Sequence, residues 1–433
     1  MYRLGGWLVG FFFFLMLVVP TTLQAERGVL LFLIFLGSFI ILATFLNSWV
    51  IAQSILLWLV ACITYSLFSI LWGVINDSQG GMAVSTVYVF WPVLFVYFIG
   101  FAKTIKPYVF LEKIILIGVF LAALSGVLFV ASSFLPALRI LDPYFKLMSG
   151  SLGLYENSTA FTLSNMATVI YGLPFMTAVI MMGPRISLYF SYKWKVFCVI
   201  GLLVSFFVML IAGRKAFMAV ALISVPLSLL LMRIVRFANF KYKSIVKIFV
   251  VVLLVSIFGL LVGSVTLGLD LSTLITHFLS GFDFSDSSNI SAARRAEQFS
   301  ALMGEWQSSY LIGFGHGSNA RSAPGDVVPW AYELQYVALL FQTGIVGMLV
   351  YGSAVTWLMY QMIRLSRKYA DLAVLMFPLL VALICFLLAN ATNPYLSKFD
   401  YLWTLFLPVG LVNIGLLRDN ARNCVDKKLL FHA

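Results

Sequence analysis

Residues 114–132 read IILIGVFLAALSGVLFVAS, a run without a charged side chain. About 20 mostly apolar residues are enough for an α-helix to cross the ~30 Å hydrocarbon core of a bilayer. Similar runs recur along the whole chain of 433 residues, which is 62% apolar and 10% charged, with a mean hydropathy of +1.03. Soluble domains are about 45–50% apolar and about 25% charged. The composition therefore excludes a water-soluble protein and predicts an all-α polytopic integral membrane protein, with residues 1–433 forming a single membrane domain.

The positions of the charges and of the Gly, Pro, Asn and Ser clusters predict about twelve transmembrane helices. Their ranges are 6–24, 29–47, 50–73, 83–102, 113–136, 165–183, 196–212, 216–232, 246–269, 332–362, 372–391 and 401–417. The first block is interpreted as a span and not as a cleaved signal peptide, because Leu23 is the wrong size for the position three residues before a cut after Ala25.

The lysines and arginines predict the orientation of this array. With a cytoplasmic N-terminus, 19 of the 28 basic residues lie in inner segments and nine in outer ones, and the 16 acidic residues divide four to twelve. The inner face then carries +15 and the outer face −3, a bias that predicts both termini in the cytoplasm. The net charge of +12 thus indicates topology and contact with anionic membrane lipids, and no nucleic acid is expected as a partner.

Most of the polar residues outside the spans fall in two outer loops, 137–164 and 270–331. The second is a large periplasmic loop inserted between the ninth and tenth spans. Ser291 is predicted to cap a helix that runs to about Trp306, so the loop is expected to be partly helical. Because most of the polar residues outside the spans lie on the outer face, the functional site is expected on that face.

Metal and disulfide chemistry are not expected. The four cysteines lie in apolar blocks or in a basic tail without a C-x-x-C pair, and no outer loop contains Asp-x-Asp. The chain has three histidines in all, so a histidine metal site is not expected either. We therefore predict no metal ion and no other cofactor.

Two basic residues stand on the outer side, where basic residues are rare. Arg214 and Lys215 lie in a tight hairpin between the seventh and eighth predicted spans. One interpretation is a pair of cations that contact lipid phosphates. The other is a fixed site for an anionic substrate group, since the planar guanidinium donates two parallel hydrogen bonds to phosphate.

Further candidates lie in and after the large loop. Glu333 stands at the mouth of the tenth span, where an ionisable side chain indicates a functional site; the alternative is an acid that merely favours a helix N-terminus. Arg295 shares the apolar face of the loop helix, and Arg294 points about a quarter-turn away. His316 lies between two glycines and is interpreted as a turn residue in preference to a base.

Three stretches resemble motifs of the bacterial O-antigen polymerases and O-antigen ligases. Residues 213–216, Gly-Arg-Lys-Ala, resemble the family's Ser-Arg-Gly segment. Arg295, Phe299 and residues 311–315 resemble its arginine, aromatic and Gly-x-Gly run in the large periplasmic loop. Residues 333–347 resemble its His-Asn or Glu-Asn motif placed eleven residues before Gly-Ile-x-Gly. Ligases usually have His at that position, so the glutamate favours a polymerase.

The resemblance implies a GT-C-like membrane fold in the bacterial inner membrane and a periplasmic active site. The reaction would be a metal-independent, inverting glycosyl transfer from an undecaprenyl-diphosphate-linked oligosaccharide to a lipid-linked repeat unit. A chain-length-regulating membrane protein is a further partner that the resemblance suggests. The alternatives are a ligase, which would use lipid A core as acceptor, and a transporter of lipid-linked oligosaccharide, although transporters usually place their ionisable residues near the bilayer midplane.

The resemblance also implies roles for individual residues. Arg214 and Arg295 would bind the diphosphate and stabilise its departure, and Glu333 would accept the proton of the attacking sugar hydroxyl. The residues expected to assist in substrate binding are Lys215, Arg294, His316 and Tyr336.

Overall fold

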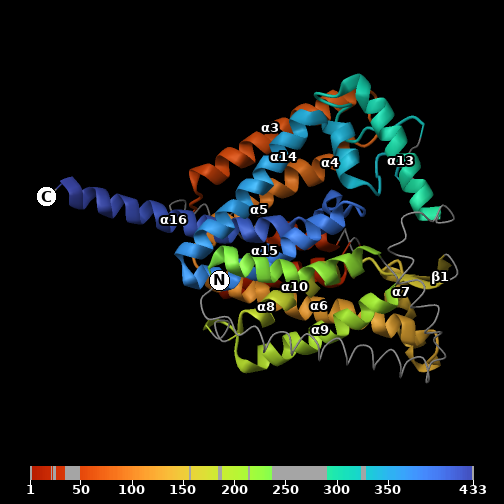
Figure 1. Ribbon diagram of the computed structural model, residues 1–433, viewed down its shortest axis with the longest axis horizontal. Coiled ribbons are helices and arrows are strands. Elements are labelled where there is room, and N and C mark those ends of the chain that lie inside the picture. The colour runs from red at the N-terminus through yellow and green to blue at the C-terminus, as the bar shows by residue number, and fades with distance from the viewer. Residues whose placement is uncertain are drawn as a thin grey trace. The chain divides into compact units, whose positions relative to one another are not determined.

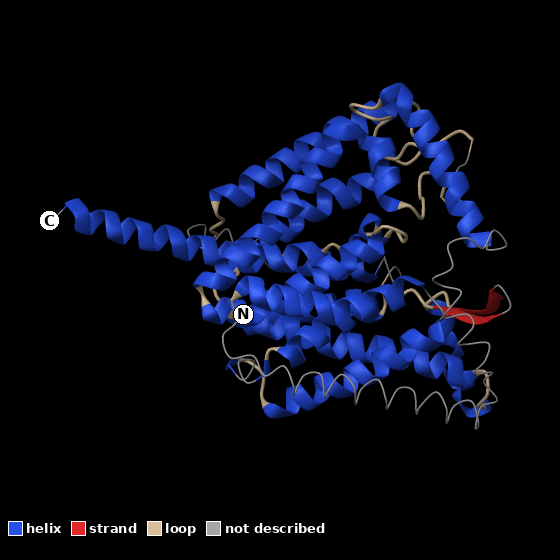
Figure 2. Ribbon diagram, viewed as in Figure 1, coloured by secondary structure: helices blue, strands red, loops and turns tan. Residues whose placement is uncertain are grey.

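The computed structural model of the protein describes residues 2–20, 22, 26–34, 49–155, 158–183, 188–212, 215–236, 290–322 and 328–431. These residues are almost entirely helical, and one short antiparallel hairpin is the exception (Figure 2). Among them, eight helices are long and apolar enough to cross a membrane: Gln53–Ile75, Gly81–Phe101, Lys106–Ser132, Tyr192–Met209, Ala216–Val235, Gln335–Lys368, Ala370–Asn390 and Phe399–Arg422. The prediction of a helical, polytopic membrane protein is confirmed at this level.

The number of twelve spans is not confirmed. Two shorter apolar helices, Trp7–Val18 and Met166–Met181, correspond to the predicted spans 6–24 and 165–183. The predicted span 246–269 and most of 29–47 lie outside the described residues. The twelve-span count and the GT-C-like fold therefore stay predictions.

The described residues form two compact units. Unit 1 comprises the described parts of 1–38, 109–289 and 377–389. Its elements are α1 (Tyr2–Val18), α6 (Lys106–Ser132), η3 (Pro136–Leu141), α7 (Asp142–Leu147), β1 (Ser151–Tyr155), β2 (Ser158–Thr162), α8 (Met166–Met181), α9 (Tyr192–Ala212), α10 (Lys215–Val235) and most of α15 (Ala370–Asn390). The two strands pair in antiparallel register, with Leu152 opposite Phe161, within the predicted outer loop 137–164.

Helix α8 lies at the centre of unit 1 and packs against α9 and α10 (Figure 1). Almost every residue of α8 is buried, as expected for a helix that is apolar on all sides. Its polar side chains find partners inside the unit: the Thr168 hydroxyl donates to the Leu17 carbonyl oxygen at 2.8 Å, and Asn165 Nδ2 donates to Ser125 Oγ at 2.9 Å.

Helix α6 begins earlier than predicted. The span predicted from the sequence starts at Lys113, because charged residues are treated as span ends. The helix itself starts at Lys106. The extension places Glu112 inside the helix, where its side chain is fully buried. In a hydropathy profile, a glutamate buried inside a helix looks the same as a glutamate in a loop, so the sequence does not indicate the burial of Glu112.

Unit 2 comprises the described parts of 39–108, 290–376 and 390–433. Its elements are α3 (Gln53–Ile75), α4 (Gly81–Ser85), η2 (Thr86–Phe90), α5 (Trp91–Phe101), α13 (Ile290–Trp306), η5 (Gln307–Ser309), α14 (Gln335–Lys368), the start of α15, η6 (Tyr395–Ser397), η7 (Phe399–Tyr401) and α16 (Trp403–Phe431). Helix α14 packs against α3, α13 and α16, and α16 also packs against α5 (Figure 1).

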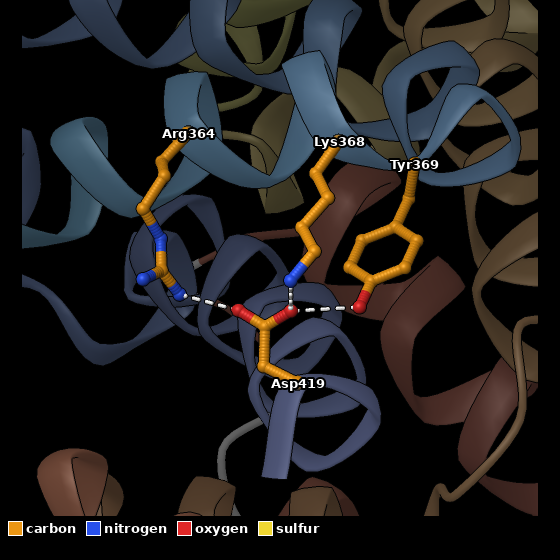
Figure 3. A network of polar contacts seen from close by, with 4 residues as sticks. All are labelled: Arg364, Lys368, Tyr369 and Asp419. Atoms are coloured by element: carbon orange, nitrogen blue, oxygen red, sulfur yellow. Dashed lines mark hydrogen bonds and ion pairs between the residues drawn. The ribbon is translucent and has the colours of Figure 1, made fainter. Parts of the chain in front are cut away.

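A cluster of ion pairs holds the C-terminal end of α14 (Figure 3). Asp419 of α16 accepts a hydrogen bond from Arg364 Nη2 at 2.8 Å, and further bonds from Lys368 Nζ and the Tyr369 hydroxyl. A second pair joins Arg418 to the carboxylate of Asp371 at 2.7 Å. Beyond the non-helical residue Gly344, residues 345–368 of α14 form a continuous helix, roughly 36 Å long at 1.5 Å per residue. This cluster therefore lies at the far end of that helix from the start of α14.

Candidate functional site

Two of the predicted catalytic residues are in direct contact at the start of α14. Arg295, from α13, donates a hydrogen bond from Nε to Glu333 Oε2 at 2.7 Å. Glu333 lies two residues before the first residue of α14. Its backbone N–H donates to Gln298 Oε1 at 3.3 Å, so a second side chain of α13 holds the same segment. Residues that belong to separate sequence motifs thus form one site.

The two elements that carry this pair are joined by a small apolar core. Leu302, Ala320, Tyr332, Ala338 and Phe341 form a cluster of buried residues that connects α13 to the start of α14. Tyr332 precedes Glu333 directly, and its hydroxyl accepts a hydrogen bond from the Ala320 N–H at 2.6 Å. Full burial of one side chain such as Leu302 contributes about 1.5–3 kcal/mol. The relative position of Arg295 and Glu333 therefore depends on packing beneath them.

The helix α13 agrees with the sequence prediction except at its start. It ends at Trp306 as expected, but it begins at Ile290, so Ser291 lies inside the helix and not at its cap. On the apolar face of this helix Leu302 is fully buried in the core cluster, whereas Phe299 is half-exposed and lies on the surface of unit 2.

The Arg295–Glu333 pair contributes little to stability. The side chains are 32% and 42% exposed, and ion pairs at such exposure contribute about 0.2–1 kcal/mol. Within the described part of the chain, Arg295 Nη1 and Nη2 and Glu333 Oε1 form no hydrogen bond. The site therefore presents both guanidinium nitrogens of the fork and one carboxylate oxygen to a ligand.

Among the described residues, Glu333 does not cap α14 through a hydrogen bond, and both interpretations of this acid stay predictions. The residue at the N-cap position of α14 is Leu334, which makes no side-chain cap. Among the described residues, the hydrogen-bond partner of the Glu333 carboxylate is Arg295 and not an N–H group of the first turn of α14.

The predicted substrate-binding residues are less closely grouped. Arg294 is an exposed neighbour of Arg295 on α13. Tyr336 lies in the first turn of α14, is partly buried and forms a hydrogen bond with the Asn390 side chain. Arg214 lies outside the described residues, and Lys215 is the first residue of α10 in unit 1. The roles of Arg214 and Lys215 stay predictions from the sequence.

His316 is fully buried and does not lie on the surface that Arg295 and Glu333 share. Its Nε2 is 2.9 Å from the Tyr351 hydroxyl, and its ring stacks on Tyr88 with centroids 4.1 Å apart. Burial lowers the pKa of His316 to about 3, an effect that the nearby Gln342 side chain partly opposes. The imidazole is therefore neutral at pH 7.

The Gly-x-Gly-x-Gly run around His316 has a structural explanation. Gly313, Gly315 and Gly317 all have positive φ, a conformation that other residues rarely adopt. A Cβ atom on any of the three would overlap the backbone of another segment: α14 at Gly313, and α3 and the start of α4 at Gly315 and Gly317. These glycines are needed for close backbone packing.

In the described residues no three His, Cys, Asp or Glu side chains gather in a way suited to a metal ion. The basic residues of α13 are Arg294 and Arg295. Arginine side chains bind phosphate without a metal ion. The arrangement is suited to holding an anionic group beside a carboxylate that accepts a proton.

No protein-family model matches the chain, and no curated protein matches it in a sequence search. The likeness to O-antigen polymerases and ligases therefore depends on the three motifs.

Proposed function

We propose that the protein is an O-antigen polymerase, a glycosyltransferase of the bacterial inner membrane that acts at the periplasmic face. The donor is a glycan on undecaprenyl diphosphate, and the acceptor is a second lipid-linked repeat unit. The observation that carries the proposal is the contact between Arg295 and Glu333, two residues that belong to separate motifs of the resemblance and lie 38 positions apart in the chain.

The reaction requires two groups with opposite tasks. The acceptor hydroxyl oxygen attacks the anomeric carbon of the donor, the bond from that carbon to the phosphate oxygen breaks, and its electron pair leaves with the lipid diphosphate. Arg295 stabilises the charge that develops on the leaving oxygens. Glu333 accepts the hydroxyl proton, a role usually worth about 10²–10⁴ in rate. The atoms that the pair leaves available, both Nη nitrogens and Oε1, suit these tasks.

A ligase would use the same donor with lipid A core as acceptor, but ligases usually have His where this chain has Glu333. A transporter of lipid-linked oligosaccharide is the second candidate, and one observation favours it. Glu112 is fully buried in α6, and neither carboxylate oxygen has a hydrogen-bond partner among the described residues. An ionisable residue inside a span often marks a transport pathway. The Arg295–Glu333 pair, which lies before α14 and not within it, favours the enzyme.

A deletion strain separates these functions. A host that lacks the protein is expected to carry lipopolysaccharide with a single repeat unit on the core, because ligation of one unit continues without polymerisation. Gel electrophoresis of lipopolysaccharide gives the banding pattern, and the same strain carrying the gene on a plasmid is the control. A core without any repeat unit would reject the polymerase and favour a ligase or a transporter.

A further inference from the structure

Helix α14 is broken at Gly344, and another part of the chain fills the break. Gly344 has φ 62° and ψ −170°, which are not helical values. The break divides α14 into a first segment, residues 335–343, and a second segment, residues 345–368. We call residues 310–318 the wedge loop, because this stretch lies against the break.

Four backbone hydrogen bonds join the wedge loop to both sides of the break. On the second segment, the N–H groups of Ile345 and Val346 donate to the carbonyl oxygens of Tyr310 and Leu311, each at 3.0 Å. On the first segment, the carbonyl oxygens of Phe341 and Gln342 accept from the wedge loop, from Phe314 at 3.1 Å and Gly315 at 2.7 Å. In an unbroken helix these groups would bond to one another. The wedge loop therefore replaces the missing helical bonds, as a span requires of any irregular backbone.

The wedge loop is also anchored on α3. The His316 N–H donates to the Ser69 carbonyl oxygen at 3.0 Å, and Trp72 Nε1 donates to the Gly313 carbonyl oxygen at 3.0 Å. A Cβ atom at Gly315 would overlap the backbone of Gly73. The loop is thus held between α3 and α14 within unit 2.

One side chain connects the wedge loop to the second segment of α14. His316 Nε2 lies 2.9 Å from the hydroxyl of Tyr351, which lies seven residues beyond the break. The same hydroxyl lies 2.7 Å from Ser66 Oγ on α3, so the three side chains form a chain of hydrogen bonds. The stacking of Tyr88 on the imidazole covers it from another side.

We propose that His316 is a positioning residue for the Arg295–Glu333 site. Its bond to Tyr351 holds the wedge loop in the break of α14, and the wedge loop in turn fixes the first segment, with Glu333 before it, against α13. The inference that the position of Glu333 matters for catalysis rests on the proposed function. The role of the wedge loop in holding the first segment of α14 in place does not.

Substitutions at His316 distinguish positioning from proton transfer. His316→Gln keeps a nitrogen donor that can reach Tyr351, and His316→Leu keeps bulk but no hydrogen bond. We expect His316→Gln to retain most of the polymer-forming rate, and His316→Leu and Tyr351→Phe to lose on the order of 10- to 100-fold, as expected when reacting groups are misplaced by about 1 Å. Tyr360→Phe is the matched control, since Tyr360 lies on the same helix and is 59% exposed. An equal loss in His316→Gln and His316→Leu would contradict a positioning role.

A second readout does not depend on activity. Ala338 lies in the first segment of α14 and is buried in the core cluster with Leu302 and Phe341. In a background with the four native cysteines replaced by alanine, Ala338→Cys should resist a membrane-impermeant maleimide when His316 and Tyr351 are intact. Added His316→Leu or Tyr351→Phe should expose the introduced thiol to labelling, and added Tyr360→Phe should not.

The two readouts separate the possible failures. If labelling of the Ala338→Cys protein increases as expected but the unmodified protein forms no polymer, the proposed function is wrong and the role of the wedge loop stands. If labelling stays low with both His316→Leu and Tyr351→Phe, the proposed positioning role is wrong, whatever happens to the rate.

Discussion

Purified Glu333→Gln protein is expected to elongate lipid-linked glycans about 10²-fold or more slowly than the unmodified protein. Glutamine keeps the shape of the side chain and can still accept the hydrogen bond that Arg295 Nε donates at 2.7 Å. It cannot take up the proton of the attacking hydroxyl. The turnover number should therefore fall while binding of the lipid-linked donor changes little. Rate and binding are measured separately, by product formation at saturating donor and by titration of the donor.

Glu297→Gln is the control for this substitution. Glu297 lies on α13, two residues after Arg295, and its side chain is exposed. The same chemical change there should leave turnover near that of the unmodified protein. If Glu333→Gln also forms polymer at a near-normal rate, Glu333 has no part in the chemistry. Its contact with Arg295 would then be a surface ion pair that contributes about 0.2–1 kcal/mol to stability.

Arg295→Lys is expected to lose most of the activity while the protein still folds and inserts. A guanidinium has five N–H donors in a planar fork, so Arg295 can bond to Glu333 through Nε and still direct both Nη nitrogens at phosphate oxygens. An ammonium group keeps the charge but cannot make this arrangement. We expect a lower kcat/KM for the donor and weaker binding of the lipid diphosphate product, measured by steady-state kinetics and by competition with that product.

Arg321→Lys is the matched control, because Arg321 is an exposed arginine in the same outer loop whose backbone N–H bonds to Glu305. It should behave like the unmodified protein. Equal activity in Arg295→Lys and Arg321→Lys would show that charge alone is needed and would reject the forked binding of phosphate by Arg295.

Hydropathy predicts the spans well where charges end the apolar run. The predicted ranges 83–102 and 372–391 differ by at most two residues from Gly81–Phe101 and Ala370–Asn390. Where a helix continues through charged residues the prediction is too short. Helix α14 runs to Lys368, six residues beyond the prediction, because Arg364 and Lys368 pair with Asp419 of α16 (Figure 3).

The members of the site could be predicted individually, but their arrangement could not. Arg295 and Glu333 are 38 residues apart, and no local periodicity indicates that they meet. The contact of the wedge loop with α14 is more difficult to predict from the sequence, because backbone hydrogen bonds between residues 310–315 and 341–346 leave no pattern of side chains. The glycines at 313, 315, 317 and 344 are its signal in the sequence, since each takes a positive φ. Tyr351, the partner of His316, lies in the middle of an apolar helix and gives no signal of its own.

The most direct test of the account is elongation by the purified protein alone. Protein in detergent or lipid nanodiscs is mixed with undecaprenyl-diphosphate-linked repeat units in the presence of excess EDTA, and the products are resolved by size. We predict a ladder of longer lipid-linked glycans, because in the proposed mechanism arginines and not a metal ion neutralise the departing diphosphate. Absence of elongation by folded protein, with or without added magnesium or manganese, would contradict the proposed function, and elongation that requires the metal would contradict the role given to Arg295.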